Sequence, residues 1–153
     1  MTGWRVGYLL GPAPLVSAIN KLQSHSTSNP TSIAQKAAVE ALNGPQDSVK
    51  TMLAAYRERR AFVIKALNEI PGMSCVEPGG AFYAYPNISA YLGKNGINTP
   101  LDFANQLLKE AHVAVVPGEA FGTNEHFRLS YAASMDDLKR GIARIAEFVA
   151  DKV

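Results

Sequence analysis

Two arginines occupy the positions in this sequence that most favour binding chemistry. Arg5 lies in WRVGYLL (4–10) and Arg128 in FRLSY (127–131), two short segments whose other residues are mainly strand formers. A charge inside an apolar strand needs a partner, and the planar guanidinium group fits the two oxygens of a carboxylate or a phosphate. Structural ion pairs occupy such positions as well. From the residues alone, each arginine is therefore either half of an ion pair or part of an anion-binding site.

The other residues with reactive side chains favour structural roles. The three histidines, His25, His112 and His126, have no metal-ligand spacing among themselves. Cys75 is the single cysteine, so the sequence predicts neither a disulfide nor a cysteine-based metal site, and its apolar surroundings favour a small core residue. His112 is expected to end a helix, where a cation interacts favourably with the helix dipole. The sequence contains no P-loop, G-x-S-x-G or G-x-G-x-x-G motif.

The composition narrows the class of protein without indicating its chemistry. The chain has 153 residues, enough for one domain with a core or for a domain plus part of another. Its 15 basic and 13 acidic residues are interspersed and give a net charge of +2, which argues against a nucleic-acid partner. No apolar run approaches the ~20 residues of a membrane span, and the opening residues lack the features of a signal peptide. We therefore expect a cytoplasmic protein with no membrane partner.

The first part of the chain predicts a strand followed by helices. The strand formers of residues 4–10 come first, and apolar residues then recur at helical spacing over 14–24 and 33–42. A longer helix is predicted over 45–70, because its apolar residues keep three- and four-residue steps until Pro71-Gly72. The basic residues midway along this helix favour a solvated face: Arg57, Arg59 and Arg60, with Glu58.

The residues after the long helix predict a small sheet and two further helices. Four short strands are expected, at 73–76, 81–85, 113–116 and 127–131. The first two flank a tight turn at EPGG. One helix is expected to begin at Thr99, followed by a proline and then an acid, and the last helix starts in a similar way at Ser134. This order predicts an α+β fold, with helices packed on one face of a small, mostly antiparallel sheet.

Five segments together carry a resemblance to a known family: MTGWRVGYLLGP, SHSTSNPTSIAQ, PGGAFYAYPNIS, VVPGEAFG and FRLSYA. In this order and spacing, the chain resembles the fold-type-I aminotransferases that depend on pyridoxal 5'-phosphate (PLP), most of all the bacterial aspartate/aromatic group. The resemblance implies that residues 1–44 are a remnant of the large PLP-binding domain. Residues 45–153, with the long interdomain helix, would be the small C-terminal domain. It also implies transfer of an amino group between an L-amino acid, aspartate-like or aromatic, and a 2-oxo acid, by a homodimer.

The resemblance assigns roles to individual residues. Arg5 matches the arginine that holds the cofactor phosphate, and Arg128 matches the arginine that binds the substrate α-carboxylate. Ser28, followed by Asn29-Pro30, belongs to a loop that reaches the cofactor of the partner subunit. MTGWR matches the second half of the pattern around the catalytic lysine, so that lysine is expected before Met1. This chain alone is therefore expected to be inactive and not to bind PLP.

Several features leave alternatives open. Gly3 and Gly7 match positions of close approach to the cofactor, although strand packing would explain them as well. Ser24 stands where some aspartate aminotransferases have an arginine for the distal carboxylate, so either another residue binds that group or the substrate is not dicarboxylic. A C–S lyase or acyl transferase of the same fold type is an alternative, as is a free-standing structural or interaction domain. Residues 1–11 would lack the neighbouring strands of the family, so they are expected to be disordered, refolded or paired with another copy.

Overall fold

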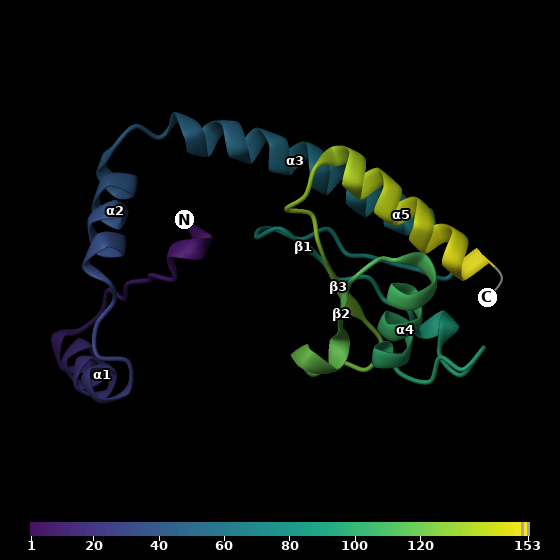
Figure 1. Ribbon diagram of the computed structural model, residues 1–153, viewed down its shortest axis with the longest axis horizontal. Helices are drawn as coiled ribbons and strands as arrows, with labels where there is room; N and C mark the ends of the chain where they lie inside the picture. Colours follow the sequence, from purple (N-terminus) through teal and green to yellow (C-terminus); the bar gives the residue numbers. More distant parts are fainter. Residues whose placement is uncertain (151, 153) are drawn as a thin grey trace. The chain divides into compact units, whose positions relative to one another are not determined.

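The chain folds as two compact units. The computed structural model describes residues 1–150 and 152. The units are Met1–Lys50 and Thr51–Val153, and the division falls within helix α3 (Asp47–Asn68; Figure 1). The boundary at Gly44-Pro45 between large-domain and small-domain residues stays a prediction. Of the helices in the described part of the chain, none is long and apolar enough to cross a membrane.

The first unit contains a short 3₁₀ helix, Thr2–Trp4, and two α-helices, α1 (Ala13–Ser26) and α2 (Ser32–Asn43). Both α-helices confirm the predictions made from the spacing of apolar residues. The strand predicted at 4–10 is wrong, because residues 5–12 have no regular structure. A strand is stable only beside another strand, and the described residues of this unit form none.

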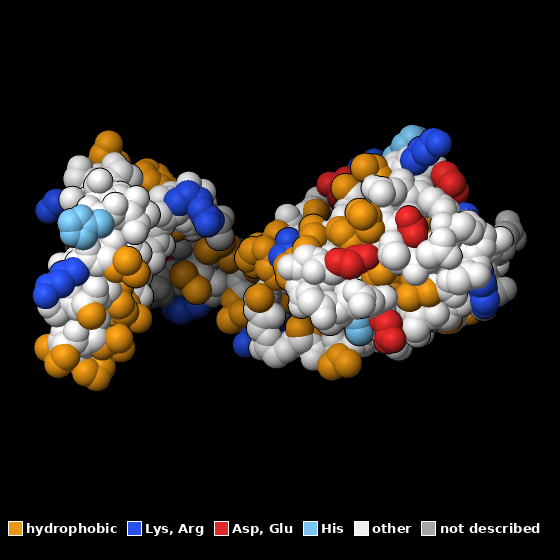
Figure 2. Space-filling view, turned by 90° about the horizontal axis from the view of Figure 1, so that it is seen from below, with side chains coloured by type: hydrophobic (Ala, Val, Ile, Leu, Met, Phe, Trp, Pro, Cys, Tyr) orange, Lys and Arg blue, Asp and Glu red, His pale blue; other side chains and the backbone are white. Residues whose placement is uncertain are grey.

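The first unit buries little of its apolar surface. Among its described hydrophobic residues only Ala34 is buried, and helix α1 has no buried residue. Tyr8 is 74% exposed, Leu10 86% and Leu22 69%. Figure 2 shows hydrophobic side chains gathered on the surface of this unit. The described residues of this unit therefore form no core of their own. Helices in proteins owe most of their stability to packing of an apolar face, and this unit does not supply that packing from its described residues.

The second unit has the predicted α+β fold, built on a three-stranded sheet. Strands β1 (Tyr83–Ala84) and β2 (Val116–Pro117) flank β3 (Phe127–Ser130), and both pairings are antiparallel (Figure 1). Helices α3, α4 (Pro100–Gln106) and α5 (Met135–Ala150) contribute with β3 to one hydrophobic core. The largest fully buried side chains of this core include Tyr91, Tyr131, Phe103, Phe127 and Leu67.

Three short helical turns complete the second unit: η2 (Ser89–Tyr91), the π-helical turn η3 (Leu107–Ala111) and η4 (Gly118–Phe121). Strand β2 covers only the end of the strand predicted at 113–116. The N–H groups of His112 and Val113 instead both donate to the carbonyl of Leu107, at the end of the π-helical turn.

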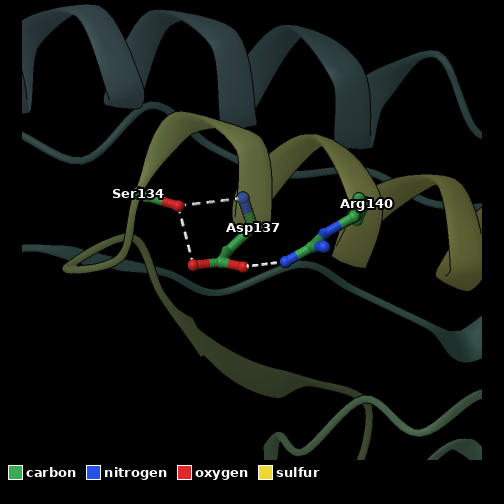
Figure 3. A network of polar contacts seen from close by, with 3 residues as sticks. All are labelled: Ser134, Asp137 and Arg140. Atoms are coloured by element: carbon green, nitrogen blue, oxygen red, sulfur yellow. Dashed lines mark hydrogen bonds and ion pairs between the residues drawn. The ribbon is translucent and has the colours of Figure 1, made fainter.

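Both predicted helix starts in this unit are confirmed. The Thr99 hydroxyl accepts from the Asp102 N–H at 3.1 Å, and the Asp102 carboxylate accepts from the Thr99 N–H at 3.0 Å, which is a capping box. The Ser134 hydroxyl accepts from the Asp137 N–H at 3.1 Å and donates to the Asp137 carboxylate at 2.7 Å (Figure 3). Arg140 pairs with the same carboxylate. These contacts lower the pKa of Asp137, and the hydrogen bond from Ser134 is the largest cause.

The hairpin predicted around EPGG does not form. At the end of α3, the Asn68 amide donates to the Cys75 carbonyl at 2.9 Å and accepts from the Cys75 N–H at 2.8 Å. These backbone groups are therefore already bound by a helix side chain. Residues 73–76 make only one isolated bridge, from Ser74 to Asn87. The second strand of the expected hairpin forms in part, as β1, and pairs with β3 instead.

Candidate functional site

Arg128 lies on the face of the sheet that points away from the core. In β3, Phe127 and Leu129 are buried, whereas Arg128 between them is half-buried and Ser130 is exposed. Successive side chains of a strand point to opposite faces, which explains this alternation. Val116 on β2 is the direct partner of Arg128 and lies on the same outer face. The strand therefore stabilises the core with one face and presents a guanidinium group on the other.

Two aromatic rings contact the Arg128 guanidinium group. Its Cζ atom lies over the Tyr83 ring, 4.3 Å from the centroid, and over the Phe121 ring, 4.6 Å from the centroid. Tyr83 comes from β1 and Phe121 from the end of η4, so the structure brings together three of the segments that carry the resemblance. Distances below about 6 Å place both contacts within the range of cation–π attraction.

The Arg128 guanidinium group has no acidic partner within the described residues. No ion pair or hydrogen bond joins it to any of them, so its contacts there are the two aromatic rings. The structural ion pair that the sequence left open is therefore not supported among these residues. A partly buried cation keeps its N–H donors available for an anion that the described chain does not supply.

The structure brings Arg5 and Ser28 to the same hollow in the first unit. This hollow has a volume of about 790 Å³, and Asn29 and apolar side chains such as Ile19 also line it. The backbone φ angles of Arg5 and Ser28 are 49° and 63°, in the left-handed region that few residues other than glycine occupy. Guanidinium, hydroxyl and amide groups are the donors that a phosphate group accepts hydrogen bonds from. The guanidinium group of Arg5 is therefore of a type that binds phosphate.

Gly3, Gly7 and Ser24, for which the sequence left alternatives open, also lie in the first unit. An added Cβ at Gly3 or Gly7 would meet no described atom within 4 Å, and neither glycine lies in a strand, so strand packing does not explain them. The Ser24 hydroxyl donates to the Lys21 carbonyl inside α1 at 2.8 Å. Ser24 is therefore engaged with its own helix.

Cys75, His112 and His126 lie in surroundings that favour structural roles. Burial raises the pKa of the Cys75 thiol, and Cys75 belongs to the core, as expected. His112 ends the π-helical turn in a left-handed conformation with a φ of 56°, and His126 stacks on Tyr85 with centroids 4.9 Å apart. No group of His, Cys, Asp and Glu in the described part of the chain could hold a metal ion.

The basic cluster of α3 corrects one prediction. Arg57 and Glu58 are exposed, as a solvated face requires, but Arg60 is not free in solvent. Its guanidinium group donates to the Pro78 carbonyl at 2.9 Å and pairs with Glu77 at 3.0 Å. Arg60 thereby fastens the EPGG segment to the long helix.

The sequence and the fold match one protein family. The sequence pattern of the family described as aminotransferase class I and II matches residues 1–145. The chain therefore belongs to this family. The family also accounts for the fold of the second unit, because solved aminotransferases share it.

Known relatives agree in sequence and in structure. The chain is 48% identical to an aspartate aminotransferase of Geobacillus stearothermophilus over 149 residues, which are 97% of this chain and 38% of the relative. It is 49% identical to an aspartate/prephenate aminotransferase of Cereibacter sphaeroides over 98% of this chain and 39% of the relative. The solved aspartate aminotransferase of Rhizobium meliloti superposes with a TM-score of 0.87 at 47% identity, over 99% of this chain and 39% of that one. The chain thus spans about two fifths of the length of these relatives.

Nothing in the sequence alone indicated that Tyr83 and Phe121 belong to the candidate site. Both lie in segments that carried the resemblance, PGGAFYAYPNIS and VVPGEAFG. Their separation from Arg128 along the chain gave no sign of contact. The available signal was indirect: an arginine in an apolar strand needs neighbours, and aromatic faces are suitable ones.

Proposed function

We propose that the whole protein containing this chain is a PLP-dependent aminotransferase. It moves an amino group between an L-amino acid, aspartate-like or aromatic, and a 2-oxo acid. Membership of the family supports the reaction class, and the names of the relatives support the substrate class. The observation that carries the proposal is Arg128, a cation presented on the outer face of the sheet without an acidic partner among the described residues.

Arg128 has a defined role in this proposal. Amino acids and 2-oxo acids both carry a carboxylate next to the reacting carbon, so one arginine can bind both substrates. Two parallel N–H···O bonds fix the orientation of a carboxylate as well as its position. Holding the substrate in one orientation converts binding into a lower barrier for the chemical step.

Arg5 and Ser28 are proposed to act on the cofactor. PLP, when bound, supplies an electron sink for the α-carbon of the substrate. The Arg5 guanidinium group, which lines the hollow of the first unit, would hold the cofactor phosphate, because a guanidinium group binds two oxygens of a phosphate at once. Ser28 would contribute its hydroxyl to the cofactor of the partner subunit in a homodimer, as the resemblance implies. The homodimer, the cytoplasmic location and a catalytic lysine outside this chain stay predictions.

The decisive experiment measures amino transfer by the whole protein with 2-oxoglutarate and a panel of amino acids. We expect transfer from aspartate or an aromatic amino acid, and a loss of about a hundredfold or more in kcat/KM for Arg128→Gln. Lys139→Gln, which removes an exposed cation of α5, is the matched control and is expected to have no effect. An unaffected Arg128→Gln variant would contradict the role of Arg128. Pyruvate and ammonia from cystathionine, without amino transfer, would indicate a lyase instead.

The isolated chain provides a further prediction. Most contacts to the cofactor are expected from residues outside it, so titration calorimetry of this chain with PLP should show no binding tighter than about millimolar, roughly −4 kcal/mol. A stoichiometric micromolar complex would show that the hollow around Arg5 is sufficient by itself, and would contradict this division of the site.

A further inference from the structure

We propose that Tyr83 and Phe121 are positioning residues, which hold the Arg128 guanidinium group so that its N–H edge faces an incoming carboxylate. The inference rests on the proposed function, in which Arg128 binds the substrate. We call the three side chains the arginine clamp. All three lie in the second unit, so the clamp does not depend on how the two units are arranged.

The two contacts of the guanidinium group involve no hydrogen-bond acceptor. A guanidinium cation is attracted to the face of an aromatic ring, whereas its five N–H donors need carbonyl, carboxylate or phosphate oxygens. Both ring centroids lie within 4.6 Å of Cζ. The ring contacts among described residues include none between Tyr83 and Phe121, so each ring packs on the arginine rather than on the other ring. The clamp therefore restrains the cation without supplying an acceptor for its N–H groups.

The Tyr83 ring is itself held in place by neighbouring aromatic residues. Tyr83 pairs with Ser130, two residues beyond Arg128, which places the two side chains on the same face of the sheet. Its ring lies 4.6 Å from the Phe82 ring, measured between centroids. Phe82 in turn stacks on Tyr56 of α3, with centroids 6.0 Å apart. This side of the clamp is therefore tied to the long helix.

The Phe121 ring is held from the other direction. It packs edge-on against Tyr85, with centroids 6.0 Å apart. Tyr85 is fixed by stacking on His126 and by a 2.6 Å hydrogen bond between its hydroxyl and that of Thr123. Phe121 remains 45% exposed, so one part of its ring is open to solvent beside the arginine. This open side leaves room for a carboxylate at the arginine.

The expected benefit is preorganisation of the arginine. A free arginine side chain loses considerable rotamer freedom when it binds an anion, and rings that restrain it in advance reduce that loss. Partly exposed cation–π contacts correspond to about two- to fivefold in a binding constant for each ring. We therefore expect Phe121→Leu to raise KM for the amino acid and the 2-oxo acid by about two- to fivefold, with kcat changed less.

The kinetic test uses the whole protein and three variants. Phe121→Leu removes the ring, and Phe121→Tyr keeps it and should restore the wild-type KM. Leu108→Ala is the matched control, because it shortens an apolar side chain that is 52% exposed and lies outside the clamp. Equal KM values for wild type and Phe121→Leu would overturn the proposal. So would an equal rise in Leu108→Ala, which would indicate a general loss of stability.

A spectroscopic test separates the clamp from the enzymatic activity. Ring currents should shift the Arg128 Nε–H proton of the 153-residue chain away from the position of a free arginine, and Phe121→Leu should reduce that shift. An unshifted wild-type signal would overturn the clamp, even if amino transfer is observed. If the ring-current shift is present but the whole protein transfers no amino group, the proposed function fails instead. The two failures are therefore distinguishable.

Discussion

The two units of this chain contain similar amphipathic helices but differ in what those helices touch. In the second unit, Leu67 of α3 and Ile145 of α5 are fully buried against a small sheet. In the first unit, Leu22 of α1 and Ile33 of α2 are 69% and 68% exposed. The comparison shows that the apolar stripe of a helix becomes part of a hydrophobic core only where another element covers it. The second unit supplies the cover from its own residues, and the described residues of the first do not.

This difference can be measured because each unit contains its own reporters. Trp4, the single tryptophan, lies in the first unit, whereas five of the six tyrosines lie in the second. Urea denaturation followed by tryptophan fluorescence therefore reports on the first unit, and near-ultraviolet circular dichroism is dominated by the tyrosines of the second. The predictions below use both signals on the 153-residue chain.

The largest effect is expected for Phe103→Ala in the second unit. Phe103 of α4 is fully buried and packs against Phe127 and Phe148, with centroids 5.4 and 5.5 Å apart. Removing its ring leaves a cavity and should lower the free energy of unfolding by about 3–5 kcal/mol. The tyrosine signal should report the loss. A change below about 1 kcal/mol would show that this core is not the source of stability.

A smaller effect is expected for Asn68→Ala at the end of α3. The variant removes both hydrogen bonds to the backbone of buried Cys75, at a cost of about 1–3 kcal/mol. Asn105→Ala, at an exposed position of α4, is the control and should change stability by no more than about 0.5 kcal/mol. Equal effects of the two variants would contradict the role of Asn68 in shaping the EPGG segment.

The cap of α5 predicts both a stability change and a pH dependence. Ser134→Ala should cost about 0.5–2 kcal/mol at neutral pH. The pKa of Asp137 is lowered in the folded state, first by the Ser134 hydrogen bond and then by Arg140. Its contribution is therefore complete above about pH 4, the ordinary pKa of an unfolded aspartate, and is lost as pH falls through the lowered value. In Ser134→Ala, the free energy of unfolding should fall less steeply as the pH is lowered. An unchanged slope of the free energy of unfolding against pH would rule out this cap as the source of the pH dependence.

The smallest effect is expected for Leu22→Ala in the first unit. Because Leu22 is 69% exposed, its truncation should change the free energy of unfolding by no more than about 0.5 kcal/mol in either signal. A loss comparable to that of Phe103→Ala would mean that Leu22 is buried in solution, and would remove the difference between the two units.

Local signals in the sequence predicted the helices well and the strands poorly. The caps at Thr99 and Ser134 depend on residues three positions apart, so a short stretch contains all the information. Strand pairing depends on distant partners. The hairpin predicted around EPGG does not form because the Asn68 amide is hydrogen-bonded to the backbone N–H and carbonyl of Cys75. The strand predicted at 4–10 does not form because no described strand lies beside it.

The candidate site was predictable only in part for the same reason. The types and surroundings of Arg5 and Arg128 singled them out as residues that need a partner. The sequence could not show that Arg128 has no acidic partner among the described residues, because that depends on the fold. Nor could it show that Tyr83 and Phe121, which are distant along the chain, converge on one guanidinium group.

The alternation of β3 has a consequence for how this protein can change. Phe127 and Leu129 are constrained by the core, whereas Arg128 and Ser130 lie on the other face, which in the proposed function is constrained by substrate binding. If Arg128 binds the substrate as proposed, mutations that alter substrate preference and mutations that alter stability fall on alternate residues of the same four-residue strand. Variation at Ser130 or Val116 can retune recognition around the arginine while the inward residues keep the fold intact. Selection for a new substrate could thus proceed on one face of β3 without eroding the other.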